Sequence, residues 1–186
     1  MTVEKAALQD SQALVTMDTI RRVREQVAPY IRQTPMVPLA RDASEVGQER
    51  LFLKLDNLQV TGAFKPRAAF AVMLSLTPEE RARGVVLTSS GNFAQAFGYA
   101  GRLMNSPIVV VMLRQSSPYK IKAAKAYGAE VVVTPANVAV DHPDHYTRKA
   151  QQIAEDTPGA WWPNQYHNPD NTEGHYRSTG AEIWRQ

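Results

Sequence analysis

A lysine stands at an unusual place in the stretch TGAFKPRAAFAVML, residues 61–74, where Lys65 directly precedes Pro66 and a long apolar run. Proline suits the first turn of a helix, so the sequence predicts a helix that begins near Lys65. The positive start of a helix, together with burial, disfavours the charged form of a lysine. A lysine with a lowered pKa is a nucleophilic amine, suited to forming a Schiff base with a carbonyl compound. The alternative is a surface lysine whose ammonium group reaches away from the helix end.

A second candidate for chemistry is the loop TSSGNFAQ, residues 88–95. It ends the apolar run at 85–88, which is typical of a buried strand, and it leads into a segment with helical spacing. Small residues at such a turn expose backbone N–H groups at the start of a helix, and these groups bind a carboxylate or a phosphate. The alternative is an ordinary turn in which the hydroxyl of Ser89 or Ser90 caps the helix.

Strands and helices alternate around these two motifs. The apolar patterns predict strands at 50–55, 85–88, 107–113 and 130–134, and helices at 16–31, 65–76, 93–104, 119–130 and 144–156. A capping box of Thr77 and Glu80, with Pro78 at the first helical position, predicts one more short helix. Continuous apolar strands in this order predict an α/β fold, a parallel sheet with helices on both faces. Ligands bind beyond the C-terminal ends of such strands, where the loop 88–95 lies.

The composition excludes several classes of protein. The chain has 186 residues, of which 44% are hydrophobic, and a net charge of +3, which is typical of a globular protein. It has no cysteine, which excludes disulfides and thiolate metal sites. No apolar run approaches the ~20 residues that span a bilayer, and no dense basic stripe or recognition module indicates a nucleic-acid partner. Since no targeting signal is present, we expect a cytoplasmic protein.

Two histidines raise the question of a metal site. His142 and His145 lie three residues apart in DHPDHY, residues 141–146, beside acidic residues. Pro143 breaks the helical geometry that such a pair of ligands needs, so we interpret the segment as a polar loop that opens a helix and expect no metal.

Four motifs, in order, resemble those of fold-type II pyridoxal-phosphate enzymes, the group that includes threonine and serine dehydratases, cysteine synthases and the tryptophan synthase β-like fold. TGAFKPRAA resembles the T-G-S-F-K-x-R-G-A motif that carries the cofactor lysine, and SSGNFAQAFGYAGRL resembles the S-S-G-N-H-x-Q loop. RQSSPYKIKAAKAYGAEVV is similar to the next helix–strand unit, and residues 163–184 resemble a segment of cysteine synthases. The resemblance extends from Thr34 to the last residue.

The resemblance implies a cofactor and roles for the matching residues. Pyridoxal phosphate would form a Schiff base with Lys65, and this lysine, once displaced by an amino-acid substrate, would remove the α-proton. Asn92 matches the residue that hydrogen-bonds the cofactor's ring oxygen, and Phe64 would lie beside the cofactor. The residues expected at the substrate are Ser89, Ser90, Gly91 and Asn92, which hold its carboxylate, and Phe93 and Gln165. Ser90 also matches an acid or base on the face opposite Lys65.

Three residues depart from the family pattern near the site. Phe93 stands where dehydratases usually have histidine and synthases threonine. Since phenylalanine forms no hydrogen bond through its side chain, we expect a substrate that is larger or less polar than serine. Ala63 replaces the usual serine, and Ala69 replaces a glycine. The Schiff-base lysine is retained.

The resemblance also implies a division into domains. Residues 53–158 would form the small α/β domain, and residues 1–52 and 159–186 would belong to a larger α/β domain that is truncated. In the family, the glycine-rich phosphate cup and the residue facing the pyridine nitrogen lie downstream of the segment that ends at Gln186. We therefore expect poor retention of the cofactor by this chain. For the complete protein, the resemblance implies a homo-oligomer, a dimer.

Three functions remain open from the sequence. The first is β-elimination of water from a hydroxy amino acid, as in threonine and serine dehydratases, giving a keto acid and ammonia. The second is β-replacement by a sulfur nucleophile, as in cysteine synthases. The third belongs to another class: a truncated, non-catalytic subunit that binds a homologue. The sequence favours the first, although elimination and replacement share their early steps.

Overall fold

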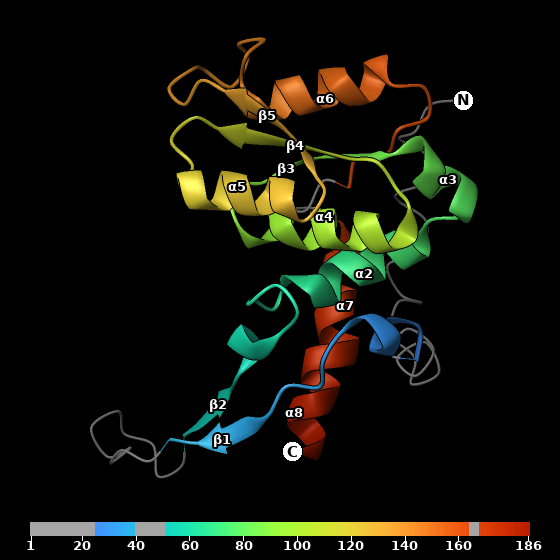
Figure 1. The fold of residues 1–186 in the computed structure, drawn as a ribbon, viewed down its shortest axis with the longest axis vertical. Helices are drawn as coiled ribbons and strands as arrows, with labels where there is room; N and C mark the ends of the chain where they lie inside the picture. The colour runs from blue at the N-terminus through green and yellow to red at the C-terminus, as the bar shows by residue number, and fades with distance from the viewer. Residues whose placement is uncertain (1–24, 40–50, 164–167) are drawn as a thin grey trace.

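The computed structural model describes residues 25–39, 51–163 and 168–186 (Figure 1). A three-stranded parallel sheet forms the centre of one part of the molecule. Its strands are β3 (Val85–Thr88), β4 (Ile108–Leu113) and β5 (Glu130–Thr134), in the order β3-β4-β5. The register pairs Val85 with Ile108 and Val109 with Glu130. A single bridge between Val85 and Trp161 adds an extended residue to the free side of β3.

Helices cover both faces of this sheet, as the sequence predicts for an α/β fold. The helices α4 (Asn92–Met104) and α5 (Pro118–Ala126) lie on one face, and α6 (Tyr146–Asp156) lies on the other (Figure 1). Strand alternation explains the arrangement: β3 and β4 turn Val85, Leu87, Val110 and Met112 toward the core with α4, and Val86 and Val111 toward α6. The expected α/β class and its parallel sheet are therefore confirmed.

The helix α2 (Lys65–Ser75) begins at the lysine, as the sequence predicts, with Pro66 in its first turn. It packs against α4, and most of its residues are buried. The short helix α3 (Pro78–Arg83) follows, with Thr77 and Glu80 forming the predicted capping box. The helix predicted over 119–130 ends earlier, at Ala126, because Gly128 takes a left-handed φ of 110°.

The strand predicted over 50–55 is shorter than expected and lies outside the parallel sheet. It forms β2 (Phe52–Lys54), which pairs antiparallel with β1 (Met36–Pro38) in a separate two-stranded sheet. The prediction that this strand belongs to the same alternation of strands and helices as the parallel sheet was wrong. Phe52 and Leu53 are exposed, so this strand lacks the burial on both faces that a central parallel strand needs.

The C-terminal part of the chain forms one helical run that packs on α2. It comprises α7 (Pro169–His175), a π-helical turn (Tyr176–Gly180) and α8 (Ala181–Arg185), drawn in red in Figure 1. Two 3-10 turns, Ala28–Tyr30 and Asp56–Leu58, complete the described elements. Of the helix predicted over 16–31, residues 16–24 lie outside the described part, and residues 25–27 are helical. Within the described residues, no helix is long and apolar enough to cross a membrane.

Candidate active site

Lys65 lies at the first position of α2, with its amine between two aromatic rings. Its Nζ is 4.9 Å from the centroid of the Phe64 ring and 5.3 Å from that of the Phe93 ring. The side chain is half-buried, and this loss of solvation lowers the pKa of the Lys65 amine below its usual value. No salt bridge joins Lys65 to another residue of the described part. The environment therefore makes the Lys65 amine easier to deprotonate than that of an exposed lysine, and the deprotonated amine is the nucleophilic form.

Ser89 supports the loop from inside. It is buried directly after β3, and its N–H donates to the carbonyl oxygen of Val111. Its Oγ accepts hydrogen bonds from the N–H groups of Gly91, at 3.3 Å, and Ala94, at 3.2 Å. The Ser89 hydroxyl thus caps the start of α4, which is the alternative that the sequence left open for this loop. A role of Ser89 in binding a substrate stays a prediction.

The rest of the loop is accessible from solvent. Ser90 and Asn92 are exposed and Gly91 is half-buried. Gly91 precedes the first residue of α4, and the first N–H groups of a helix have no acceptor within the helix. The loop therefore offers an exposed hydroxyl, an exposed amide and helix-start N–H groups beside the Lys65 region.

Phe93 connects the two motifs of the candidate site. Its side chain is only 2% exposed and packs on Phe97, with ring centroids 4.6 Å apart. Through the contact of its ring with the Lys65 amine, the start of α4 lies next to the start of α2. Phe64, by contrast, is 44% exposed and covers the outer side of the amine. Gln165, the remaining predicted site residue, lies outside the described residues.

His175 is a site residue whose role the sequence did not indicate. It ends α7, and its ring centroid lies 5.0 Å from that of Phe64. Its Nδ1 is 3.4 Å from the Thr179 hydroxyl, and its buried Nε2 has no partner among the described residues. Burial, and then the positive charges of Lys65 and Arg67, lower the pKa of His175 to about 4. The imidazole is therefore neutral at pH 7. The sequence signal that could have indicated a role for His175 was its position within residues 163–184, the segment that resembles cysteine synthases.

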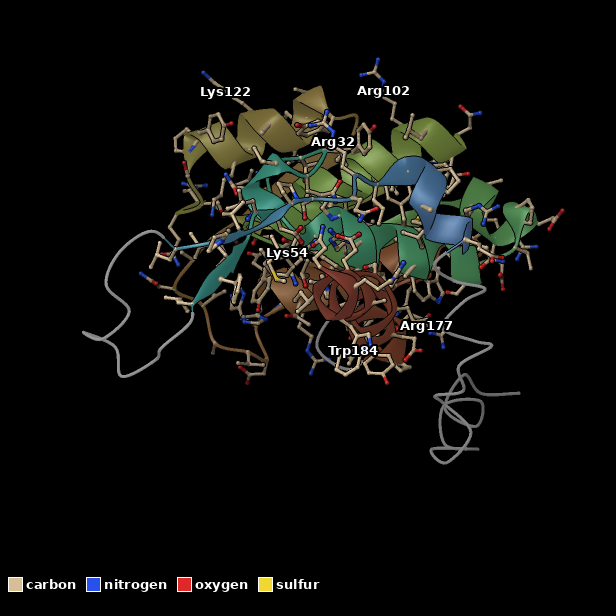
Figure 2. All side chains as sticks on the ribbon, turned by 90° about the horizontal axis from the view of Figure 1, so that it is seen from below. Arg32, Lys54, Arg102, Lys122, Arg177 and Trp184 are labelled. Carbon is tan, nitrogen blue, oxygen red and sulfur yellow. The ribbon has the colours of Figure 1, made fainter. Side chains whose placement is uncertain are left out.

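A buried charge network fixes the start of α2. Arg67 is fully buried, and its Nε and Nη2 donate to the two carboxylate oxygens of Asp56, each at 2.9 Å. Its Nη1 and Nη2 donate to Glu182 at 2.7 and 2.9 Å. Lys54 adds a further ion pair to Glu182. Figure 2 shows Lys54 between its own strand and the C-terminal helical run. The network joins three segments of the chain beside the start of α2, where Lys65 lies.

The same network controls the charge of its carboxylates. Burial by itself would raise the pKa of Asp56, but hydrogen bonds from Arg67 and Thr34 hold it below its usual value. Burial likewise opposes ionisation of Glu182, and hydrogen bonds from Arg67 and Lys54 lower the pKa of that carboxyl. Both acids are therefore ionised at neutral pH. Because Arg67 follows the first residue of α2 by two positions, charged groups as well as packing hold the start of this helix in place.

Among the described residues, no three histidine or acidic side chains are grouped so that they could hold a metal ion. In the segment 141–146, His142 Nδ1 accepts a hydrogen bond from the Asp144 N–H at 3.0 Å. This bond belongs to the turn that precedes α6.

Comparison with known proteins decides the family. The family model described as "Pyridoxal-phosphate dependent enzyme" matches residues 27–186. The chain belongs to this family. The resemblance in the lysine motif and the small-residue loop is therefore confirmed, and so is the family's pyridoxal-phosphate cofactor.

Relatives within the family give the likeness in detail. The chain is 31% identical over 137 residues to the catabolic L-threonine dehydratase TdcB of Staphylococcus aureus, a match that covers 74% of this chain and 39% of the dehydratase. It superposes on maize serine racemase with a TM-score of 0.81 at 28% identity, covering 93% of this chain and 50% of the racemase. A threonine deaminase from T.th. gives a TM-score of 0.75 at 31% identity, with 92% and 52% covered. The chain thus spans about two fifths of the length of the curated relatives it matches.

The residues present fit the family's cofactor. A carbonyl compound needs a neutral amine, and Lys65 is half-buried with a lowered pKa. A flat aromatic ring needs apolar contacts, which Phe64 offers beside that amine. Polar atoms of a ligand need partners, and two buried atoms without one among the described residues are Nε2 of His175 and Oγ1 of Thr61.

Proposed function

We propose that this chain is the part of a pyridoxal-phosphate lyase that carries the cofactor lysine, and that the enzyme eliminates water from a hydroxy amino acid. The products are a keto acid and ammonia. The observation that supports this most is the half-buried Lys65 amine, which begins α2 next to the loop that starts α4. Relatives named threonine dehydratase and threonine deaminase favour the same reaction.

When bound, pyridoxal phosphate supplies the electron sink that makes the α-proton of an amino acid acidic and lets a β-substituent leave. Lys65 holds the cofactor and afterwards, as a free amine of lowered pKa, takes up the α-proton at Nζ. Phe64 and Asn92 orient the cofactor. Ser90, on the exposed part of the loop, exchanges a proton on the opposite face and helps the departing hydroxyl leave as water.

The substrate is held by the loop. Ser90, Gly91 and Asn92 line the place of its carboxylate at the start of α4, where the N–H groups that do not already donate to Ser89 bind it. Ser89 contributes by holding the loop in shape, since its Oγ accepts two of the N–H groups there. Phe93 and Gln165 complete the side of the site near the substrate side chain. Because Phe93 offers no hydrogen-bonding group, a substrate with a methyl group at the β-carbon fits better than serine.

The second candidate is β-replacement, in which a sulfur nucleophile adds to the same substrate after the β-substituent has left. The resemblance of residues 163–184 to cysteine synthases favours it. A third candidate, a non-catalytic subunit that binds a homologue, draws support from α8, where Trp184 is 91% exposed at the outer surface (Figure 2). An exposed tryptophan of this kind is enriched at protein interfaces.

The organisation of the whole protein is part of the proposal. Residues 53–158 form the small domain, and residues 1–52 and 159–186 contribute to the larger one, in a cytoplasmic homodimer. The position of β1 and α8 at the end away from the parallel sheet supports this division (Figure 1).

One assay separates the three functions. The chain is supplied with pyridoxal phosphate and threonine or serine, and keto acid is measured with and without an added thiol, beside a Lys65→Ala variant. Release without thiol, absent in the variant, is expected for elimination. Amino-acid consumption that requires the thiol would establish replacement instead. No turnover, combined with co-elution with a full-length relative in size-exclusion chromatography, would overturn the catalytic proposal in favour of a non-catalytic subunit.

A further inference from the structure

A second lysine, Lys120, reaches the same loop from the neighbouring strand. β3 and β4 are parallel neighbours, so the connections that follow them open at the same edge of the sheet. The connection after β3 contains Gly91, and the one after β4 leads to Lys120 in the first turn of α5. A Cβ placed on Gly91 would lie only 3.6 Å from Lys120 Nζ. The ammonium group therefore lies directly against the backbone of the loop.

This arrangement gathers positive charge at the starts of two helices. The starts of α4 and α5 are both positive ends of helix dipoles, and neither helix has an acidic residue in its first turn. Lys120 is half-buried, and no hydrogen bond or ion pair joins it to another residue in the described part of the chain. The Lys65 amine lies nearby, against the ring of Phe93 in the first turn of α4. The positive charge of Lys120 and of the two helix starts would be stabilised by an anion that binds between them.

A buried hydroxyl in the same connection also lacks a partner. Ser116, four residues before Lys120, is 7% exposed, and its Oγ has no partner among the described residues. Buried polar atoms in proteins are nearly always paired, so this hydroxyl, in the connection that leads to Lys120, points to a partner such as a ligand or water. This observation is independent of the charge at the loop.

We propose that Lys120 is a further substrate-binding residue, whose ammonium group pairs with the α-carboxylate of the amino acid that the loop holds. The inference rests on the proposed function, because it names the group of the substrate that this lysine recognises. A carboxylate has two oxygens, so one accepts the loop N–H groups while the other faces the ammonium group. Lys120 thereby selects free amino acids over their amides and esters.

The site is tested with acetate as the simplest carboxylate. The chain, labelled with ¹⁵N, is titrated with sodium acetate at constant ionic strength, and the amide signals of Gly91 and Asn92 are followed by NMR. Lys120→Met is compared with Lys122→Met, a matched control on the same helix whose side chain points into solvent (Figure 2). Because Lys120 is only half-buried, we expect its loss to weaken acetate binding about fivefold, and the control to leave binding unchanged.

Several results would overturn this assignment. Acetate binding that is equal in the wild type and Lys120→Met, or acetate that leaves the Gly91 signal unmoved, contradicts it. Inorganic phosphate that binds the loop more tightly than acetate contradicts the choice of a carboxylate. A second variant, Lys120→Gln, guards against misfolding of the first, and both must keep the dispersed spectrum of the wild type.

Kinetics separate this inference from the proposed function. In the active enzyme, Lys120→Met should raise KM for the amino acid about fivefold with little change in kcat, and should leave KM for the amino-acid amide unchanged. If acetate binding depends on Lys120 but no β-elimination occurs, the carboxylate site stands and the proposed reaction fails. If elimination occurs with an unchanged KM in the variant, the reaction stands and the role of Lys120 fails.

Discussion

Removing Arg67 should destabilise the fold through the two acids that it leaves behind. In Arg67→Met, an apolar side chain of shorter reach but similar volume replaces the arginine, so little packing volume is lost. Asp56 and Glu182 lose four hydrogen bonds from Arg67 and remain largely buried, with side chains 13% and 11% exposed. Breaking a buried ion pair from one side typically costs about 3–5 kcal/mol. Lys54 still pairs with Glu182, so we expect the lower end, about 3 kcal/mol.

Urea denaturation followed by circular dichroism measures this loss. Arg102→Met is the matched control, since Arg102 is exposed on α4 and points away from the molecule in Figure 2. The control should change the free energy of unfolding by less than about 0.5 kcal/mol. A loss below about 1 kcal/mol in Arg67→Met, or one equal to that of the control, would refute the reasoning.

The double variant Arg67→Met with Glu182→Gln sharpens the test. Removing the charge of Glu182 leaves one buried carboxylate instead of two, so the double variant should be less destabilised than the sum of the single variants. Additive losses would show that Arg67 and Glu182 do not interact. The pH dependence of the free energy of unfolding offers an independent check. Folding lowers the pKa of the Asp56 and Glu182 carboxyl groups, so their contribution to stability is lost as pH falls below their usual pKa values near 4.

Three further predictions concern single residues. Burial lowers the pKa of Lys65, so reductive methylation should modify it at lower pH than the exposed Lys122, as mass spectrometry would show; equal pH profiles would contradict this. The pKa of His175 falls from 6.5 to about 4 on folding, so the free energy of unfolding should decrease as pH is lowered through this window, and His175→Asn should flatten the decrease. In Gly101→Ala, the new Cβ would lie 2.2 Å from a β4 side chain, so thermal denaturation should show that the free energy of unfolding falls by about 1–3 kcal/mol. In the control Gly180→Ala, the new Cβ has a single neighbouring atom within 4 Å, at 3.9 Å, and the free energy of unfolding should not change.

Local rules were enough to predict most elements of the fold. The capping box at Thr77 and the helix start at Pro66 each depend on a few adjacent residues, and both are present. The strand at 50–55 failed because an alternating run does not reveal its partner. Only the structure shows that β2 pairs with β1 rather than with the parallel sheet.

The residues of the candidate site likewise fall into those that local sequence predicts and those that tertiary packing alone brings together. Lys65 and the loop were found because their types and local spacing are unusual. The charge network was missed because Arg67 and Glu182 are 115 residues apart in the chain. His175 and Lys120 were missed for a similar reason: each reaches the site from an element whose place is set by tertiary packing. The role of Ser89 as an internal cap was recognisable only as one of two alternatives.

The central claim is that Lys65 is the amine that carries the cofactor. The most direct test is to incubate the chain with pyridoxal phosphate, reduce it with borohydride, and map the labelled lysine by mass spectrometry of its peptides. We predict that the pyridoxyl group is found on Lys65 at stoichiometries where Lys120 and Lys122 remain unmodified. Labelling spread evenly over the lysines, or concentrated on a lysine other than Lys65, would contradict the account.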